Sequence, residues 1–289
     1  MPLLFATAAS GLGEYPPNMP DARVETYKTV GNVQLKLWIF APEGHQPTNR
    51  CAAAVFFFGG GWAAGSPRQF EPQCRYLASR GMVAITADYR VKSRHHALPV
   101  QCAADAKSAI RWVRANAARL GIDPNRIVAG GGSAGGHVAA CTGTLEELDE
   151  KGEDTSVSAV PNAMVLFNPV LVLAPLGGKD FGGFGAKLAA KELGAEAERL
   201  SPAHHVKPGT PPTIVFHGRA DKTVPFATAE AFAAAMKAAG NRCELMGYDG
   251  QSHGFFNHKA AGNPFYDDTV RKMDEFLVSL GYLTTKKDK

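Results

Sequence analysis

The chain has 289 residues, of which 45% are hydrophobic and 20% charged, and its net charge is +4. This composition is that of an ordinary globular domain. No stripe of basic and aromatic residues is present, which argues against nucleic-acid binding, and no apolar run reaches the roughly 20 residues of a membrane-spanning helix.

The first residues, MPLLFATAASG, lack the basic region that opens a signal peptide, so we interpret them as an N-terminal arm. This favours a cytoplasmic location over a secreted protein whose signal has been removed. The five cysteines are scattered, without the CxxC spacing of a zinc site and without an even-numbered disulfide framework. The sequence therefore predicts no metal and no cofactor, and it indicates no oligomeric state.

Strand-like and helix-like segments alternate along the chain. We expect strands at 24–30, 33–40, 52–58, 82–89, 126–130, 162–170, 213–218 and 243–249. We expect helices at 68–81, 101–121, 137–145, 227–239 and 267–280. The first two strands are expected to form a hairpin that turns at Gly31 and Asn32. Because alternating strands and helices build a mostly parallel sheet covered on both faces, this order predicts a single α/β domain, residues 1–289.

One long segment, residues 171–206, interrupts the alternation after the sixth strand. It is rich in Gly, Ala and Pro and contains no strand-like run. A segment of this length is uncommon as a plain loop. We therefore interpret it as a small lid or cap insertion. The alternative is a crossover helix with irregular flanks.

The sequence GGGSAGG, residues 130–136, surrounds Ser133 with glycines between a predicted strand and a predicted helix. In this context G-x-S-x-G is the pattern of a nucleophile elbow, a sharp turn that exposes the serine hydroxyl. Side chains two residues away would collide with the neighbouring strand or helix, which explains the glycines. A phosphate-binding loop is the alternative explanation for these glycines. However, the sequence has no G-K-[ST] motif here and no acidic residue at the end of a following strand.

A serine hydroxyl needs a base, and nine histidines compete for that role. His253 follows the last predicted strand in a glycine-flanked loop. Loops after parallel strands gather at one edge of the sheet, where Ser133 is also expected, so His253 is the predicted base. His137, one turn into the nucleophile helix, is expected to be held along that helix. His217 is expected to have a core or turn role.

The base in turn needs a carboxylate that fixes its tautomer and stabilises the imidazolium. Asp221 follows the preceding predicted strand and is the predicted acid, with Asp249 as the second choice. The chain order Ser133, Asp221, His253 is the one expected where the serine sits on such an elbow.

A run of three glycines follows the third predicted strand, in the sequence FFFGGGW. Glycine lets the backbone approach a reacting carbonyl group closely. We therefore expect the N–H groups of Gly59, Gly60 and Gly61 to form an oxyanion hole together with that of Ala134. The free N–H groups at the start of the helix after Ser133 would add to this stabilisation.

The sequence ADYR, residues 87–90, follows the next predicted strand. We expect Asp88 and Arg90 to form a structural ion pair that braces the strand end, rather than to bind substrate.

These motifs resemble those of α/β-hydrolases, near the hormone-sensitive-lipase-like and the acetylxylan- and feruloyl-esterase-like carboxylesterases. The resemblance extends from Val24 to Leu280 and rests on FFGGGW, ADYR, GIDPNRIVAGGGSAGGHVAA, HGRADKTVPF and GQSHGFF. It implies an eight-stranded, mostly parallel sheet with helices on both faces and an antiparallel second strand. It also implies oxyanion donors at Gly60, Gly61 and Ala134.

The chain departs from this family at two places. Phe58 stands where the family usually has a histidine before the glycines, which removes a side-chain brace of that loop but not its backbone donors. Residues 1–23 contain no counterpart of the large cap helices of the lipase-like group, so we expect an open site that accepts a bulky alcohol such as a sugar. Trp62, Phe181 and Phe184 are the expected pocket walls.

The predicted function is that of a serine esterase that hydrolyses short-acyl carboxylic esters, such as acetylated or aryl-acylated sugars, through an acyl-enzyme. Its predicted partner is a small-molecule or carbohydrate ester. Two alternatives stay open: an amide hydrolase similar to arylformamidases or peptidases, and a hydrolase-like binding protein without catalysis. The complete set of Ser133, Asp221 and His253 argues against the second alternative.

Overall fold

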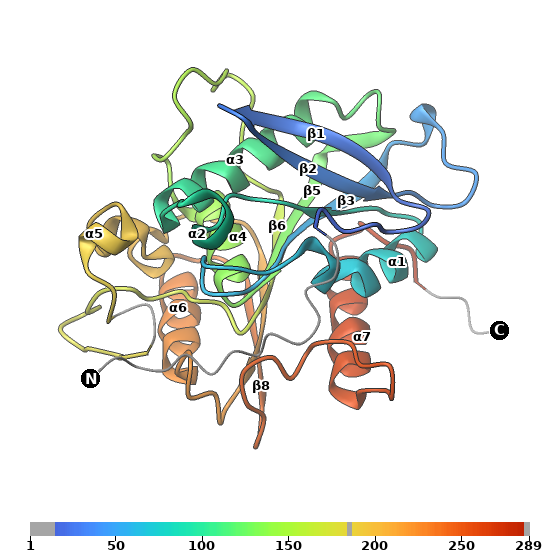
Figure 1. The fold of residues 1–289 in the computed structure, drawn as a ribbon. Coiled ribbons are helices and arrows are strands. Elements are labelled where there is room, and N and C mark those ends of the chain that lie inside the picture. Colours follow the sequence, from blue (N-terminus) through green and yellow to red (C-terminus); the bar gives the residue numbers. More distant parts are fainter. Residues whose placement is uncertain (1–14, 184–186, 286–289) are drawn as a thin grey trace.

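Eight strands form one sheet in the computed structural model, which describes residues 15–183 and 187–285. The strands are β1 (Arg23–Val30), β2 (Val33–Phe40), β3 (Cys51–Phe57), β4 (Val83–Ala87), β5 (Ile122–Gly132), β6 (Ala163–Phe167), β7 (Thr213–Gly218) and β8 (Cys243–Tyr248). Their order across the sheet is β1-β2-β4-β3-β5-β6-β7-β8. Figure 1 shows how this sheet lies among the helices. β2 is antiparallel to both β1 and β4, and the other neighbours are parallel. The predicted mostly parallel eight-stranded sheet is therefore confirmed.

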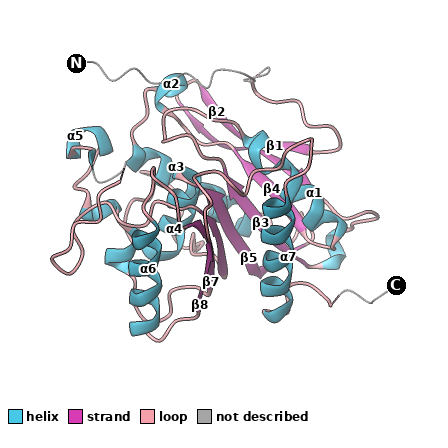
Figure 2. Ribbon diagram, turned by 90° about the horizontal axis from the view of Figure 1, so that it is seen from below, coloured by secondary structure: helices cyan, strands magenta, loops and turns pink. Residues whose placement is uncertain are grey.

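Helices cover both faces of this sheet (Figure 2). The longer helices are α1 (Glu71–Ser79), α3 (Pro99–Ala115), α4 (Ala134–Thr144), α6 (Phe226–Ala238) and α7 (Pro264–Ser279). The short helical turns are η1 (Pro47–Asn49), η2 (Pro67–Phe70), α2 (Lys92–His95), α5 (Ala190–Leu193), η4 (Glu198–Leu200) and η5 (Pro202–His205). α1 and α7 pack on one face, and α3, α4 and α6 pack on the other.

The central strand β3 illustrates how both faces are buried. Phe56 belongs to the apolar cluster under α1 and α7, whereas Phe57 belongs to the cluster under α3 and α4, and both side chains are fully buried. Successive side chains of a strand point to opposite faces, so a doubly covered strand requires an unbroken apolar run. Burial of each large apolar side chain contributes about 1.5–3 kcal/mol.

The helix α3 is shorter than the sequence predicts. It ends at Ala115 rather than at Gly121. The Asn116 side-chain amide donates a hydrogen bond to the carbonyl of Trp112 (2.9 Å), and the chain leaves the helix there. Gly121 then adopts φ +65°, and β5 begins at Ile122. Asparagine competes with helical structure through such local hydrogen bonds, which the apolar periodicity of the sequence does not record.

The long segment at 171–206 is integrated into the core. Its described residues include the short helical elements α5, η4 and η5. The Ala203 amide donates to the carbonyl of Leu171 (2.9 Å), which closes the base of the segment. Leu193 and Leu200 are fully buried in the cluster under α3 and α4. The role of this segment as a lid stays a prediction.

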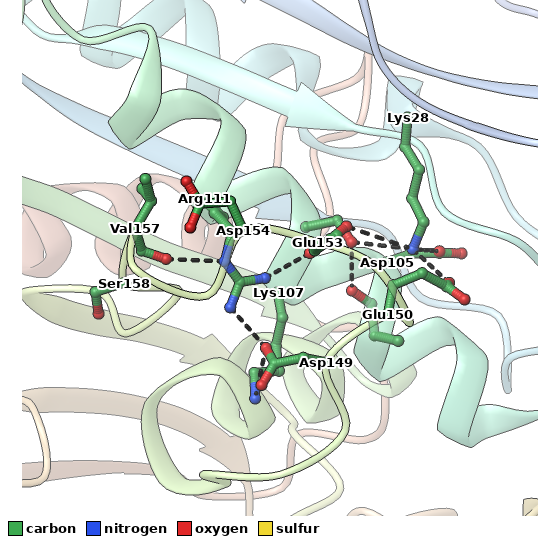
Figure 3. A network of polar contacts seen from close by, with 12 residues as sticks. Lys28, Asp105, Lys107, Arg111, Asp149, Glu150, Glu153, Asp154, Val157 and Ser158 are labelled. Carbon is green, nitrogen blue, oxygen red and sulfur yellow. Dashed lines mark hydrogen bonds and ion pairs between the residues drawn. The ribbon is translucent and has the colours of Figure 1, made fainter.

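A buried carboxylate on α3 ties several parts of the fold together (Figure 3). Asp105 accepts two hydrogen bonds from the guanidinium group of Arg90 (2.8 and 2.7 Å) and lies 2.7 Å from the ammonium group of Lys28 on β1. Glu150, in the loop after α4, contacts both cations (2.5 and 2.7 Å). This network joins β1, the segment after β4, α3 and the loop after α4.

The predicted ion pair between Asp88 and Arg90 does not form, because Arg90 is directed to α3. Asp88 instead accepts a hydrogen bond from the Tyr15 hydroxyl, and its carboxylate lies 3.7 Å from the guanidinium of Arg94. Burial raises the pKa of Asp88 to about 6. A spacing of two residues carries no information about charged partners that arrive from other elements.

We expect Asp105→Ala to lower the free energy of unfolding by about 3–5 kcal/mol, because the buried cations of Lys28 and Arg90 would lose the fully buried carboxylate that they share and keep in common the partly exposed Glu150. Urea unfolding followed by circular dichroism measures the change. Arg271→Ala is the matched control, since the ion pairs of Arg271 lie at the surface, and its unfolding midpoint should barely move. Equal losses in the two variants would contradict the importance of the buried network.

Candidate active site

Ser133 lies at the junction of β5 and α4, in a sharply turned backbone with φ +54° and ψ −121°. A β-carbon at Gly131 would lie 2.4 Å from the carbonyl oxygen of Gly135, and one at Gly135 would lie 2.0 Å from that of Phe57. Side chains do not approach backbone atoms so closely, so both positions require glycine. Strained conformations such as that of Ser133 are typical of functional sites, where the surrounding structure holds them in place.

The ends of three strands bring a serine, a histidine and a carboxylate together. His253 lies in the loop after β8. The distance from its Nε2 to Ser133 Oγ is 2.9 Å, and the distance from its Nδ1 to Asp221 Oδ2 is 2.7 Å. Asp221 lies in the loop after β7. The structure thus gathers the three residues of the predicted triad, and hydrogen bonds on both ring nitrogens give the imidazole one defined orientation.

The carboxylate of Asp221 is buried and accepts several hydrogen bonds. The amides of Thr223 (2.8 Å) and Val224 (3.0 Å) donate to its Oδ1. Burial alone would raise the pKa of Asp221, but hydrogen bonds from two histidines and from the Val224 amide outweigh burial and hold this pKa well below its usual range. The carboxylate therefore stays ionised at neutral pH.

Asn168 is a site residue that the sequence analysis does not identify. It directly follows β6, and its side-chain amide donates to Asp221 Oδ2. The backbone of Asn168 adopts φ +41°, and its backbone N–H donates a hydrogen bond to the carbonyl of Phe216 (2.7 Å). The one available signal in the sequence is its position, because Asn168, like Asp221, follows the end of a parallel strand.

Two further polar residues have contacts of other kinds. His217, at the end of β7, is fully buried, and its Nε2 lies 2.9 Å from the carbonyl oxygen of Val224 and 3.4 Å from Asp221 Oδ2, so it is the second histidine beside Asp221 and braces the turn that carries it. Asp249 is exposed and pairs with Arg219 (3.0 Å). The structure therefore directs the carboxylate of Asp249 to the surface rather than to the imidazole.

The glycine loop after β3 has an unusual backbone. Gly60, Gly61 and Trp62 have φ values of +131°, +62° and +57°. Residues other than glycine rarely adopt this region, and at Gly60 a β-carbon would also lie 2.2 Å from the carbonyl oxygen of Ala64. The two glycines therefore allow a turn that a chain with side chains at these positions would avoid.

This loop is held in place by other residues, although Phe58 stands where related sequences usually have a histidine. The Tyr89 hydroxyl donates to the carbonyl of Phe58 (2.7 Å), and the two rings stack with their centroids 4.2 Å apart. The Gly59 amide donates to Gln69 Oε1 (2.6 Å), and the Gln69 side-chain amide donates to Asn257 Oδ1 (2.9 Å). Gln69 thereby occupies the N–H group of Gly59, which removes it from the candidate oxyanion donors.

A small pocket of about 220 Å³ opens beside the serine. The residues that line it are Gly61, Trp62, Ser133, Ala134, Val170, Thr223, Val224 and His253. Trp62 thus forms part of the wall, and Gly61 and Ala134 border the same space as the serine hydroxyl. Phe181 is not among the described residues that line this pocket, and Phe184 lies outside the described residues.

A larger hollow of about 660 Å³ begins at Gly59 and extends to Tyr15, in the segment before β1, and to Arg94 on α2. Asn257, in the same loop as the candidate base His253, also lines it. The glycine loop therefore borders two spaces of different size, one small and mostly apolar, the other large and edged by polar side chains.

Within residues 15–183 and 187–285, no three His, Cys, Asp or Glu side chains are grouped as metal ligands. No helix in the same part of the chain has both the length and the apolar character needed to cross a membrane.

The sheet topology, the serine elbow and the aligned side chains define an α/β-hydrolase. A sequence model of the BD-FAE family matches residues 37–236, and a model of the dienelactone hydrolase family matches residues 194–280. The chain belongs to the BD-FAE family.

Solved structures similar to this chain include those of Thermogutta terrifontis esterase 2. Its apo form is 54% identical, with a TM-score of 0.90, and the match covers 94% of this chain and 100% of that chain. Other structures of that esterase are propionate-bound, butyrate-bound or phosphonylated by sarin.

Two curated relatives are also named as esterases. Esterase LipC of Mycobacterium tuberculosis is 32% identical over 223 residues, which are 72% of this chain and 54% of LipC. A probable isoprenylcysteine alpha-carbonyl methylesterase of Oryza sativa subsp. japonica is 27% identical over 244 residues, which are 73% of this chain and 56% of that protein. This chain thus spans about half the length of these curated relatives. The names of all three proteins support a carboxylic ester hydrolase.

We expect Gly135→Ala to prevent recovery of folded protein or to lower its unfolding temperature strongly, because the added methyl group would overlap the backbone of β3. Gly143→Ala is the matched control on the same helix. Its methyl group would meet the flexible end of Met164 and make an ordinary contact with Pro211 (3.5 Å), and alanine is favoured over glycine in helices by about 0.5–1 kcal/mol. Thermal unfolding of both variants measures the difference, and a stable Gly135→Ala variant would contradict the clearance argument.

Proposed function

We propose that the protein hydrolyses carboxylic esters, with Ser133 as the nucleophile, His253 as the base and Asp221 as the carboxylate that orients the base. The observation that carries this proposal is the continuous run of hydrogen bonds from Ser133 Oγ through both ring nitrogens of His253 to Asp221. The phosphonylated form of the Thermogutta terrifontis esterase supports it, since an activated nucleophile reacts in this way.

In the proposed reaction, His253 Nε2 takes the proton from Ser133 Oγ as this oxygen attacks the ester carbonyl carbon. The ionised Asp221 stabilises the resulting imidazolium, whose proton then passes to the departing alcohol. A water molecule next attacks the acyl-enzyme, again giving its proton to His253. The proton returns to Ser133 as the carboxylic acid leaves, so the enzyme ends in its starting state.

The negative oxygen formed in both steps needs hydrogen-bond donors. We propose the N–H groups of Gly60, Gly61 and Ala134 for this role. Ala134 begins α4, where unpaired N–H groups and the helix dipole favour negative charge, and Gly61 borders the pocket that holds Ser133. The loss of one such donor typically lowers the rate by about 10²–10³.

We further propose that the acyl group is short and that the alcohol is bulky, with acetylated or aryl-acylated sugars as one such class. The small size of the pocket beside Ser133, which is lined by Trp62, Val170 and Val224, supports a short acyl group. The propionate and butyrate bound to the Thermogutta terrifontis esterase support it as well. The larger hollow that begins at Gly59 offers space for the other half of the ester.

The nucleophile is tested with a fluorophosphonate probe. We expect one covalent label, mapped by peptide mass spectrometry to Ser133, and neither label nor esterase activity in Ser133→Ala. Label on a different residue, or full activity in Ser133→Ala, would overturn the assignment.

The orienting carboxylate is tested by a matched pair of variants. Asp221→Asn should lower kcat by on the order of 10⁴-fold, because the amide would favour the wrong imidazole tautomer. Asp249→Asn, which changes an exposed carboxylate paired with Arg219, should keep wild-type kcat. A larger loss in Asp249→Asn than in Asp221→Asn would transfer the role to Asp249.

The acyl preference is tested with a series of nitrophenyl esters from acetyl to octanoyl, beside acetylated sugars and formylated amines. Each methylene that fits strengthens binding by up to about 0.8 kcal/mol, but a closed pocket reverses this gain by overlap. We expect kcat/KM to be highest for acetyl or propionyl esters and to fall by octanoyl. An optimum at eight carbons or more would refute the short-acyl proposal, and faster hydrolysis of the formylated amines would favour the amide alternative.

A further inference from the structure

His137 contacts both the glycine loop and the long segment at 171–206. It lies on α4, one turn after Ser133, and is fully buried. Its Nδ1 accepts a hydrogen bond from the indole N–H of Trp62 (3.2 Å), and its Nε2 lies 2.7 Å from the carbonyl oxygen of Leu200. One imidazole therefore connects the wall of the small pocket to the η4 turn.

These two contacts permit one protonation state of His137. An indole nitrogen can only donate a hydrogen bond, so Nδ1 carries no proton, and a carbonyl oxygen can only accept, so Nε2 carries one. A second proton, on Nδ1, would face the indole N–H of Trp62. Burial lowers the pKa of His137 to about 4, which keeps the imidazole neutral at ordinary pH.

Trp62 needs support from its surroundings because its own backbone is unfavourable. Its φ of +57° is rare for a bulky residue, and it directly follows two glycines with positive φ. Its side chain is only 2% exposed and packs edge-on against His137, with ring centroids 5.1 Å apart. Its carbonyl accepts a hydrogen bond from the Lys92 amide (2.9 Å). Contacts on both sides of the residue therefore hold a backbone shape that the local sequence disfavours.

We propose that His137 is a positioning residue that fixes the indole of Trp62 as the wall of the pocket beside Ser133, and thereby sets the length of acyl chain that the enzyme accepts. The kinetic part of this inference rests on the proposed esterase function. Because Trp62 follows Gly60 and Gly61 directly, the same contact also steadies the proposed oxyanion donors. His137 takes no part in proton transfer, since both of its ring nitrogens are engaged away from the serine.

The proposal is tested first by acyl selectivity. His137→Phe retains a buried ring but removes both hydrogen bonds. We expect it to raise the ratio of kcat/KM for hexanoyl over acetyl nitrophenyl ester by at least about fivefold, because the indole loses the hydrogen bond to Nδ1 that fixes its orientation at the pocket. Trp62→Phe should shift this ratio in the same direction. The double variant should add no further shift, since the two residues act through one contact.

Two further variants keep this test decisive. His137→Asn retains an acceptor near the Nδ1 position and should restore a ratio close to that of the wild type, while losing the contact with Leu200. Thr142→Val is the control, because Thr142 is a buried α4 residue whose hydroxyl bonds within the helix to the carbonyl of Ala139. It should keep the wild-type ratio even if stability falls. A folded His137→Phe variant with an unchanged ratio would overturn the proposal.

The contact itself is tested without turnover by nitrogen NMR of the imidazole and the indole. We expect His137 to show the Nε2-protonated neutral tautomer throughout about pH 6–8. We also expect the Trp62 indole proton to exchange faster with water in His137→Phe than in the wild type. An Nδ1-protonated tautomer would overturn the proposal. If the wild type hydrolysed none of the esters, the esterase function would fail, while these spectra would still decide the His137–Trp62 contact.

Discussion

The close approach of α4 to the end of β3 is the constraint on which the rest of this site depends. Gly135 has no room for a β-carbon, which would lie 2.0 Å from the carbonyl oxygen of Phe57 and 2.4 Å from that of Phe58. Because Gly135 has no side chain, the first turn of α4 can pack directly against the glycine loop that continues from β3. The serine hydroxyl and the N–H groups of two separate elements can then face one small space, as the proposed reaction at an ester carbonyl requires.

A second requirement of the site is that the buried carboxylate of Asp221 stays negatively charged. Asp221 stays ionised because the turn after β7 directs two backbone amides at one of its oxygens, while Asn168 and His253 donate to the other. A buried carboxylate without such donors would tend to take up a proton. On α3, the buried carboxylate of Asp105 is stabilised in the same way by the cations of Lys28 and Arg90. Both carboxylates are thus stabilised by partners from more than one element.

The sequence alone determined the order of strands and helices, the doubly covered sheet, and the serine, carboxylate and histidine that the fold brings together. These features follow from local rules. Apolar periodicity tells strands from helices, and glycines at fixed offsets mark the elbow. The ends of parallel strands meet at one edge of a sheet, so Ser133, Asp221 and His253 could be expected as neighbours although they lie far apart in the chain.

Only the tertiary structure decided which polar groups pair with one another. Arg90 pairs with Asp105 rather than with Asp88, and Gln69 takes the N–H of Gly59. His137 receives the indole N–H of Trp62. None of these pairs has a periodic signature, because a long polar side chain can turn toward whichever distant element offers a donor, an acceptor or a charge. Spacing records which face of an element a residue occupies, whereas its partner exists only after the elements have packed.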